Sequence, residues 1–136
     1  MRCRVVAIPL LLLALLTACG PSRVETERIR GVLATRAQAL NNRNLPLYLS
    51  VVSSGYSHHG KDFSRLKDEQ AAAFKEFEQV AYQAGEPSIA VKGERAEVAG
   101  DYRMKVIIRG KEMQFEGKER ITLVKESGVW KISAGL

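Results

Sequence analysis

The sequence contains only two cysteines, Cys3 and Cys19, and both lie close to its beginning. The remainder of the chain therefore has no thiol with which to form a disulfide, and its stability has to come from packing. With 136 residues, 46% of them hydrophobic, the chain has enough apolar material for the core of one domain.

The sequence also lacks the motifs of common enzyme classes: a G-x-S-x-G nucleophile turn, a phosphate-binding loop and a dinucleotide-binding glycine motif. The net charge of +6 is spread along the chain without a Lys/Arg block, which argues against a nucleic-acid partner. The only histidines, His58 and His59, are adjacent and would point in opposite directions in an extended segment. No cysteine or acidic cluster completes a metal site, so we expect no metal and no cofactor.

The beginning of the chain has the order of an export signal. Arg2 and Arg4 precede an apolar run from Val5 to Leu16, which is too short to cross a bilayer as a helix. The motif Leu16-Thr17-Ala18-Cys19 follows and resembles the lipobox of bacterial lipoproteins. The resemblance implies cleavage before Cys19 and acylation of its thiol; the alternative is an ordinary secretory signal that happens to contain a cysteine.

This interpretation divides the chain into a signal peptide (1–18), a lipidated cysteine with its tether (19–25) and a domain (26–136). Two or more acyl chains on Cys19 would anchor the protein firmly to a bilayer. Gly20 stands where an aspartate favours inner-membrane retention in lipoproteins that the motif resembles. We therefore expect a lipid-anchored protein of the bacterial cell envelope, at the outer membrane and facing the periplasm.

Helical periodicity fills the first half of the domain. Apolar residues at spacings of three and four predict a helix over 24–41. Asn44 is placed to cap a second, short helix that has Pro46 in its first turn. The segment 53–61 has the composition of a loop, and a third helix is expected from Asp62 or Ser64 to Glu78.

The period changes to two after Gln79, which predicts antiparallel strands. Three two-residue turns place the apolar side chains on one face: Gly93-Glu94, Gly110-Lys111 and Ser127-Gly128. They predict that Val91 faces Ala96, Val106 faces Phe115, Tyr102 faces Glu119, Leu123 faces Ile132, and Ile121 faces Ala134. A fifth strand is expected over 80–83.

One predicted strand, 95–109, is long enough to require strong curvature, with Gly100 and Gly117 as bending points. The predicted fold is α+β: a cone-shaped α+β barrel in which three N-terminal helices pack in a strongly curved antiparallel sheet. The open end of such a cone is a natural pocket.

Three stretches of the domain resemble the nuclear transport factor 2-like superfamily, and its SnoaL-like and ketosteroid-isomerase-like branches in particular. They are "SSGYSHHGKDF", "PSIAVKGERAEV" and "GKERITLVKESGVWKI". The resemblance covers nearly all of the domain and implies the same cone with a central cavity. Family members include isomerases, dehydratases, ligand binders and interaction modules, so the fold does not select a function. The aspartate and tyrosine on which isomerase-type members rely have no counterpart that we can place.

The candidate site centres on Glu119, which falls on the apolar face of its strand. A hydroxyl donated by Tyr102 would satisfy part of its desolvation cost, and the alternative is a solvated carboxylate at the rim of the cone. The pocket candidates are Glu119, Tyr102, Tyr48, Tyr56, Met104 and Phe115.

The inward face is otherwise almost wholly apolar, which favours non-catalytic binding of a small apolar ligand or of an envelope protein partner. The first alternative is an isomerase- or dehydratase-type enzyme that uses Glu119 as its acid or base. The second is a structural module that forms a homodimer through the charged outer face of the sheet.

Overall fold

The computed structural model describes residues 23–136, and the predicted signal peptide, Cys19 and the start of the tether lie outside the described residues. Three helices occupy the first half of the domain: α1 (Arg23–Asn42), α2 (Leu45–Ser50) and α3 (Phe63–Glu76). The predicted order of three helices followed by strands is confirmed. None of the helices within 23–136 is long and apolar enough to cross a membrane.

Side-chain caps define where two of these helices begin. The Asn44 side chain accepts a hydrogen bond from the Leu47 N–H, and Asp62 does the same for the Arg65 N–H at the start of α3. Helix α3 ends at Glu76, two residues before the predicted end, because Phe77 has extended backbone angles. The predicted loop before α3 contains a short pair of strands, β1 (Ser57–His58) and β2 (Lys61–Asp62).

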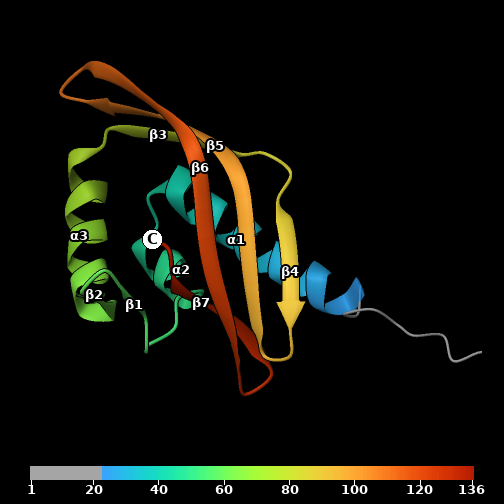
Figure 1. Cartoon of the computed structure of the whole chain (residues 1–136). Helices are drawn as coiled ribbons and strands as arrows, with labels where there is room; N and C mark the ends of the chain where they lie inside the picture. Colours follow the sequence, from blue (N-terminus) through green and yellow to red (C-terminus); the bar gives the residue numbers. More distant parts are fainter. Residues whose placement is uncertain (1–22) are drawn as a thin grey trace, which may run out of the picture.

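The second half of the domain is one antiparallel sheet. Its strands are β3 (Gln79–Ala84), β4 (Ser88–Lys92), β5 (Arg95–Ile108), β6 (Lys111–Glu126) and β7 (Val129–Ala134). The order is β3-β5-β6-β7, and β4 also pairs with β5. Strand β3 is the fifth strand that was expected over 80–83. Figure 1 shows the sheet curving over α1 and α2, with α3 at the far side of the concave surface. The predicted α+β fold is confirmed.

The predicted register is correct for one hairpin and for part of another. Val91 pairs with Ala96 across the β4–β5 turn, and Leu123 pairs with Ile132 across the β6–β7 turn. A register shift between Thr122 and Leu123 then places Thr122 opposite Ala134. The prediction that Ile121 faces Ala134 is therefore wrong, because a bulge leaves Ser133 as an extra residue on β7.

The predicted register of the β5–β6 hairpin is wrong by two residues. The turn is formed by Arg109 and Gly110, with φ angles of 50° and 75°, so Val106 pairs with Met113. Positive φ at both central residues is what a type I′ turn requires, and its twist matches the flanking strands. A shift of two leaves every side chain on its predicted face but changes its partner, so Tyr102 faces Gly117 and not Glu119.

The observed register also improves the charge pattern of the outer face. Arg103 lies 3.7 Å from Glu116, and Lys105 lies 3.3 Å from Glu112. Lys118 is opposite Asp101, where the predicted register placed it opposite Arg103.

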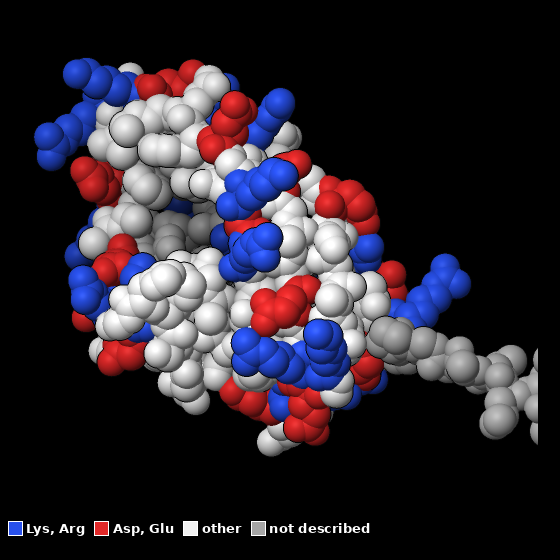
Figure 2. Space-filling model, in the orientation of Figure 1, with Lys and Arg blue, Asp and Glu red and all other residues white. Residues whose placement is uncertain are grey.

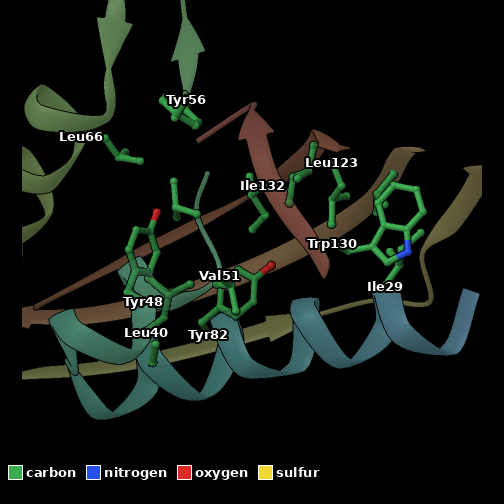
Figure 3. Packing of buried hydrophobic residues seen from close by; sticks show 14 of the residues in the cluster. Ile29, Leu40, Tyr48, Val51, Tyr56, Leu66, Tyr82, Leu123, Trp130 and Ile132 are labelled. Carbon is green, nitrogen blue, oxygen red and sulfur yellow. The ribbon is translucent and has the colours of Figure 1, made fainter. Parts of the chain in front are cut away.

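The core lies where α1 and α2 cross the sheet near β7 (Figure 3). Ile29 from α1 and Ile121, Leu123 and Ile132 from the sheet are fully buried, and Trp130 is 2% exposed. The apolar face does not stay covered along the whole sheet: Met113 is 45% exposed and Phe115 is 41% exposed. The expectation that all inward side chains share one interior is therefore wrong for the far end of the β5–β6 hairpin.

Candidate functional site

A buried polar cluster joins α1 to the concave face of the sheet. It consists of Arg36 from α1, Tyr82 from β3 and Glu119 from β6, and we call these three residues the Arg36 cluster. The side chains of Arg36 and Glu119 are only 11% and 17% exposed.

The Arg36 cluster satisfies both oxygens of its carboxylate. Arg36 donates from Nη1 to Glu119 Oε1 at 3.3 Å and from Nη2 to Glu119 Oε2 at 3.1 Å. The Tyr82 hydroxyl donates to Glu119 Oε1 and accepts from Arg36 Nη1 at 3.1 Å. The guanidinium carbon also lies 5.1 Å from the centre of the Tyr82 ring. A bidentate Arg–carboxylate pair of this kind holds the guanidinium and the carboxylate in a defined geometry.

Burial and charge at the Arg36 cluster keep Tyr82 and the nearby Tyr48 neutral and Arg36 charged. Burial raises the pKa of Tyr82 to about 12, against the opposing effect of the Arg36 charge. Burial also raises the pKa of Tyr48, again opposed by Arg36. Burial is the largest single influence on the pKa of Arg36 and lowers it, but the charge of Glu119, the nearby Tyr82 and Tyr48 and the hydrogen bond to Glu119 together outweigh burial, so the net shift is upward.

A cavity of about 700 Å³ opens beside the Arg36 cluster, between α3 and the concave face of the sheet. We call it the cone cavity, and Figure 2 shows the hollow between the β5–β6 hairpin and the helical half of the molecule. Its walls are rich in aromatic and apolar side chains, including Tyr48, Phe74, Phe77, Val80, Tyr82, Tyr102 and Met104. A volume of this size is typical of small-molecule sites.

Four of the six pocket candidates line the cone cavity: Glu119, Tyr102, Tyr48 and Met104. Glu119 is paired with Arg36 and Tyr82, so the predicted Glu119–Tyr102 pair is wrong. The Tyr102 ring lies parallel to Tyr82, with 6.3 Å between the ring centres, and covers Gly117. An added Cβ at Gly117 would lie 3.5 Å from the Tyr102 ring, which is an ordinary van der Waals contact, so the ring packs closely on this glycine without requiring it.

The other two candidates lie elsewhere. Tyr56 is buried in the core, where its hydroxyl donates to the Leu136 carbonyl at 2.6 Å and accepts from the Leu136 N–H at 2.8 Å. Phe115 is exposed on the far part of the β5–β6 hairpin and does not line the cone cavity.

Arg36 and Tyr82 are not among the residues predicted for the site, although the sequence carries a signal for Arg36. Arg36 lies three residues after Leu33 and four before Leu40, on the apolar stripe of α1. Its charge alone would favour an exposed position. A charged residue in phase with an apolar stripe predicts a buried partner of opposite charge, and Glu119 is the inward carboxylate that provides it.

The two histidines also differ from expectation. His59 has a φ of 47°, so the segment is not extended, and the two rings are in contact with their centres 4.0 Å apart. His58 lines the cone cavity. Across residues 23–136, no group of three or more His, Cys, Asp or Glu side chains is arranged to hold a metal ion.

The chain matches no protein-family model and no curated protein. Its fold is similar to that of solved nuclear transport factor 2-like proteins. One from Salmonella enterica serovar Typhimurium aligns with a TM-score of 0.73 at 16% identity, over 82% of this chain and 89% of its own. A proposed scytalone dehydratase from Novosphingobium aromaticivorans aligns with a TM-score of 0.75 at 15% identity, over 82% and 81%. A proposed dehydratase of the same fold from Streptomyces avermitilis aligns with a TM-score of 0.72 at 9% identity, over 82% and 93%. At these identities the likeness shows the fold alone: the domain has a nuclear transport factor 2-like fold.

Proposed function

We propose that this protein is a lipid-anchored envelope protein that binds a small, largely apolar molecule in the cone cavity without reacting with it. The walls of the cavity provide aromatic and aliphatic surface, and its polar lining consists of the Arg36 cluster together with His58, Gln70, Lys118 and Arg120. Apolar walls with a few fixed polar groups are typical of small-molecule sites.

The observation that carries the non-catalytic part is the engagement of Glu119. Both of its oxygens already accept hydrogen bonds from Arg36, and Oε1 also accepts one from Tyr82. A general base needs a lone pair within hydrogen-bond reach of the proton that it removes. A carboxylate held in this way is suited to fixing the shape of the cavity.

Neutral ligand binding is tested by filling the cavity from α3. Ala73 lines the cone cavity, whereas its neighbour Ala72 is exposed and does not. We expect Ala73→Phe to lower the affinity for the neutral fluorescent probe N-phenyl-1-naphthylamine at least tenfold, and Ala72→Phe to leave it unchanged. Equal binding by both variants would overturn the proposal.

A dehydratase is the rival function, because two proteins of similar fold are described as proposed dehydratases. It predicts that β-hydroxy ketones lose water in the presence of this protein and that Glu119→Gln abolishes this turnover. Turnover by the parent protein that is lost in a folded Glu119→Gln variant would replace the binding proposal with an enzymatic one.

Anchoring is tested separately, because it concerns residues outside those that the structure describes. We expect the full-length protein made in a bacterial host to fractionate with the outer membrane and to carry acyl chains on Cys19. The Cys19→Ser variant should be unprocessed and unacylated. Normal maturation of that variant would contradict the lipoprotein proposal and leave the binding proposal intact.

A further inference from the structure

A second, smaller cavity of about 280 Å³ lies between α1 and the segment that joins β3 to β4. We call it the slot. Only the three residues of the Arg36 cluster line both the slot and the cone cavity, so this cluster is their common wall. The rest of the slot is formed by α1, by the β3–β4 connection and by β5 around Gly100.

The slot exists because small residues stand where larger ones would fill it. Ala34, Ala37, Ala84, Gly85 and Gly100 line it, and the other walls include Leu33, Pro87 and Val98. Arg30 on α1, which lines the slot, pairs at the surface with Glu86 in the β3–β4 connection at 2.7 Å.

One unsatisfied group in the common wall points to a ligand atom. Arg36 Nε is a buried donor without a hydrogen-bond partner, and it is the only such side-chain nitrogen or oxygen among residues 23–136. Buried donors are normally paired, and leaving one unpaired is costly. The guanidinium would have to turn within its pair with Glu119 to present this N–H to the slot, where an acceptor oxygen of a bound molecule would satisfy it.

The charge of the common wall restricts that molecule further. The positive charge of Arg36 is already balanced by Glu119, and the pKa of Tyr82 is raised to about 12, so its hydroxyl is neutral at ordinary pH. The slot is lined by two cations, Arg30 and Arg36, and by two carboxylates, Asp101 and Glu119, so its charges balance. An ionised ligand would add an uncompensated charge to this half-enclosed site, which is unfavourable. The walls therefore fit a neutral molecule.

We infer that the slot is a second binding site, separate from the cone cavity, for a fragment-sized neutral apolar molecule that carries one acceptor oxygen. The oxygen accepts from Arg36 Nε, and the hydrocarbon part lies against Leu33, Pro87 and Val98. This inference does not depend on what the cone cavity binds.

The oxygen requirement is tested with three probes of similar size: cyclohexanone, methylenecyclohexane and cyclohexanecarboxylate. We expect cyclohexanone to shift the Arg36 Nε–H signal and the Leu33 and Ala37 methyl signals in NMR spectra of the ¹⁵N,¹³C-labelled protein. The hydrocarbon and the carboxylate should bind at least tenfold more weakly. Equal affinity for all three probes would overturn the assigned ligand class.

The location is tested with matched variants on one helix. Ala34 and Gln38 are both exposed on α1, but only Ala34 lines the slot. We expect Ala34→Phe to raise the Kd for cyclohexanone at least tenfold and Gln38→Phe to leave it unchanged. Ala84→Leu, which fills the slot from the sheet, should repeat the loss in a different structural context.

The cone-filling variant separates this inference from the proposed function. Ala73→Phe should not affect cyclohexanone binding. If Ala73→Phe removes the binding and both slot variants keep it, the probe occupies the cone cavity and the slot is not a site. If the slot variants lose cyclohexanone and keep N-phenyl-1-naphthylamine, the two sites are independent.

Discussion

The two halves of strand β6 have the same alternating pattern and very different surroundings. In the half near β7, Ile121 and Leu123 are fully buried. In the other half, Met113 and Phe115 point to the same side of the sheet but are 45% and 41% exposed. Figure 1 shows the reason: α1 and α2 lie under the half of β6 near β7, and the β5–β6 hairpin, which carries the other half, extends past these helices.

This difference separates two properties that one sequence pattern mixes together. Alternation with a period of two reports which side chains share a face. It does not report how far the covering helices reach, because that depends on where α1 and α2 cross the sheet. Glu119 lies on β6 between the two halves, where the core ends and the cone cavity begins.

The largest effect is expected at this boundary. Arg36→Met would leave Glu119 buried without its charge partner, which typically lowers the free energy of unfolding by about 3–5 kcal/mol. Urea denaturation measures the loss. The double variant Arg36→Met/Glu119→Leu should recover much of it, because the unpaired charge is then gone.

The control for this prediction is an exposed ion pair on the same helix. Arg30 pairs with Glu86, whose side chain is 79% exposed. Arg30→Met should lower the free energy of unfolding by less than about 1 kcal/mol. An equally small loss for Arg36→Met would mean that the Arg36 cluster contributes little to stability.

The next prediction compares the two halves directly. Leu123→Ala should lower the free energy of unfolding by about 2–5 kcal/mol, because it opens a void in the core. Phe115→Ala should lower it by less than about 1 kcal/mol, because the ring is 41% exposed. Urea denaturation of both variants tests this.

A loss at Phe115 as large as at Leu123 would contradict this account of the hairpin. In that case the ring is covered in solution, for example by a second copy of the chain. Light scattering at several protein concentrations would then show a molar mass that rises toward that of a dimer.

The sequence predicted the elements of this fold better than it predicted their contacts. Turn residues and alternation were enough for the β4–β5 pairing, where Val91 faces Ala96. They were not enough for the β5–β6 hairpin, since Arg109-Gly110 and Gly110-Lys111 leave the same side chains on each face. Only the positive φ that Arg109 adopts distinguishes the two turns, and an arginine side chain does not predict a positive φ.

The same limit explains what was missed in the candidate site. Glu119 was recognised because a single strand shows that it faces inward. Its partner depends on how α1 lies across the sheet, which brings together residues 83 positions apart. Tyr102 was chosen as the partner from a register that is wrong by two residues, whereas Arg36 and Tyr82 come from elements whose placement no local pattern gives.

The pH dependence of stability provides a smaller effect at the same boundary. Burial raises the pKa of Tyr82 to about 12 in the folded protein, from an ordinary value of 10.0. Its contribution is therefore fully present below pH 10 and is lost as the pH rises toward 12. Urea denaturation between these pH values should show a falling free energy of unfolding, and Tyr82→Phe should reduce the slope.

Some slope should remain in Tyr82→Phe, because burial also raises the pKa of Tyr48. The double variant Tyr48→Phe/Tyr82→Phe should therefore be flatter than either single variant. An unchanged slope in the double variant would show that neither phenol is buried as the structure places it.

The smallest effect is expected at the opposite end of the covered half, where the first turn of α1 meets the β6–β7 hairpin. Trp130 Nε1 donates to Glu25 Oε2, and Lys125 Nζ lies 3.1 Å from Glu25 Oε1. These contacts, with the Trp130 hydrogen bond first and Lys125 next, lower the pKa of Glu25 below 4.5. Their contribution to stability is present above that pH and is lost as the pH falls through the lowered value.

Trp130 is the only tryptophan, so its fluorescence reports on this contact directly. We expect the emission of the folded protein to change below pH 4.5 as Glu25 takes up its proton. Glu25→Gln keeps an acceptor oxygen for the indole and removes the charge, so the acid change should disappear while the protein stays folded. Glu27→Gln, which changes the next acidic residue of α1, should leave the acid change in place.

Glu25 holds the end of α1 that lies farther from the Arg36 cluster. Loss of the Glu25 charge should therefore leave the cone cavity and its probe binding unaltered. A loss of probe binding in Glu25→Gln would instead mean that the covered half of the sheet and the cavity respond as one unit.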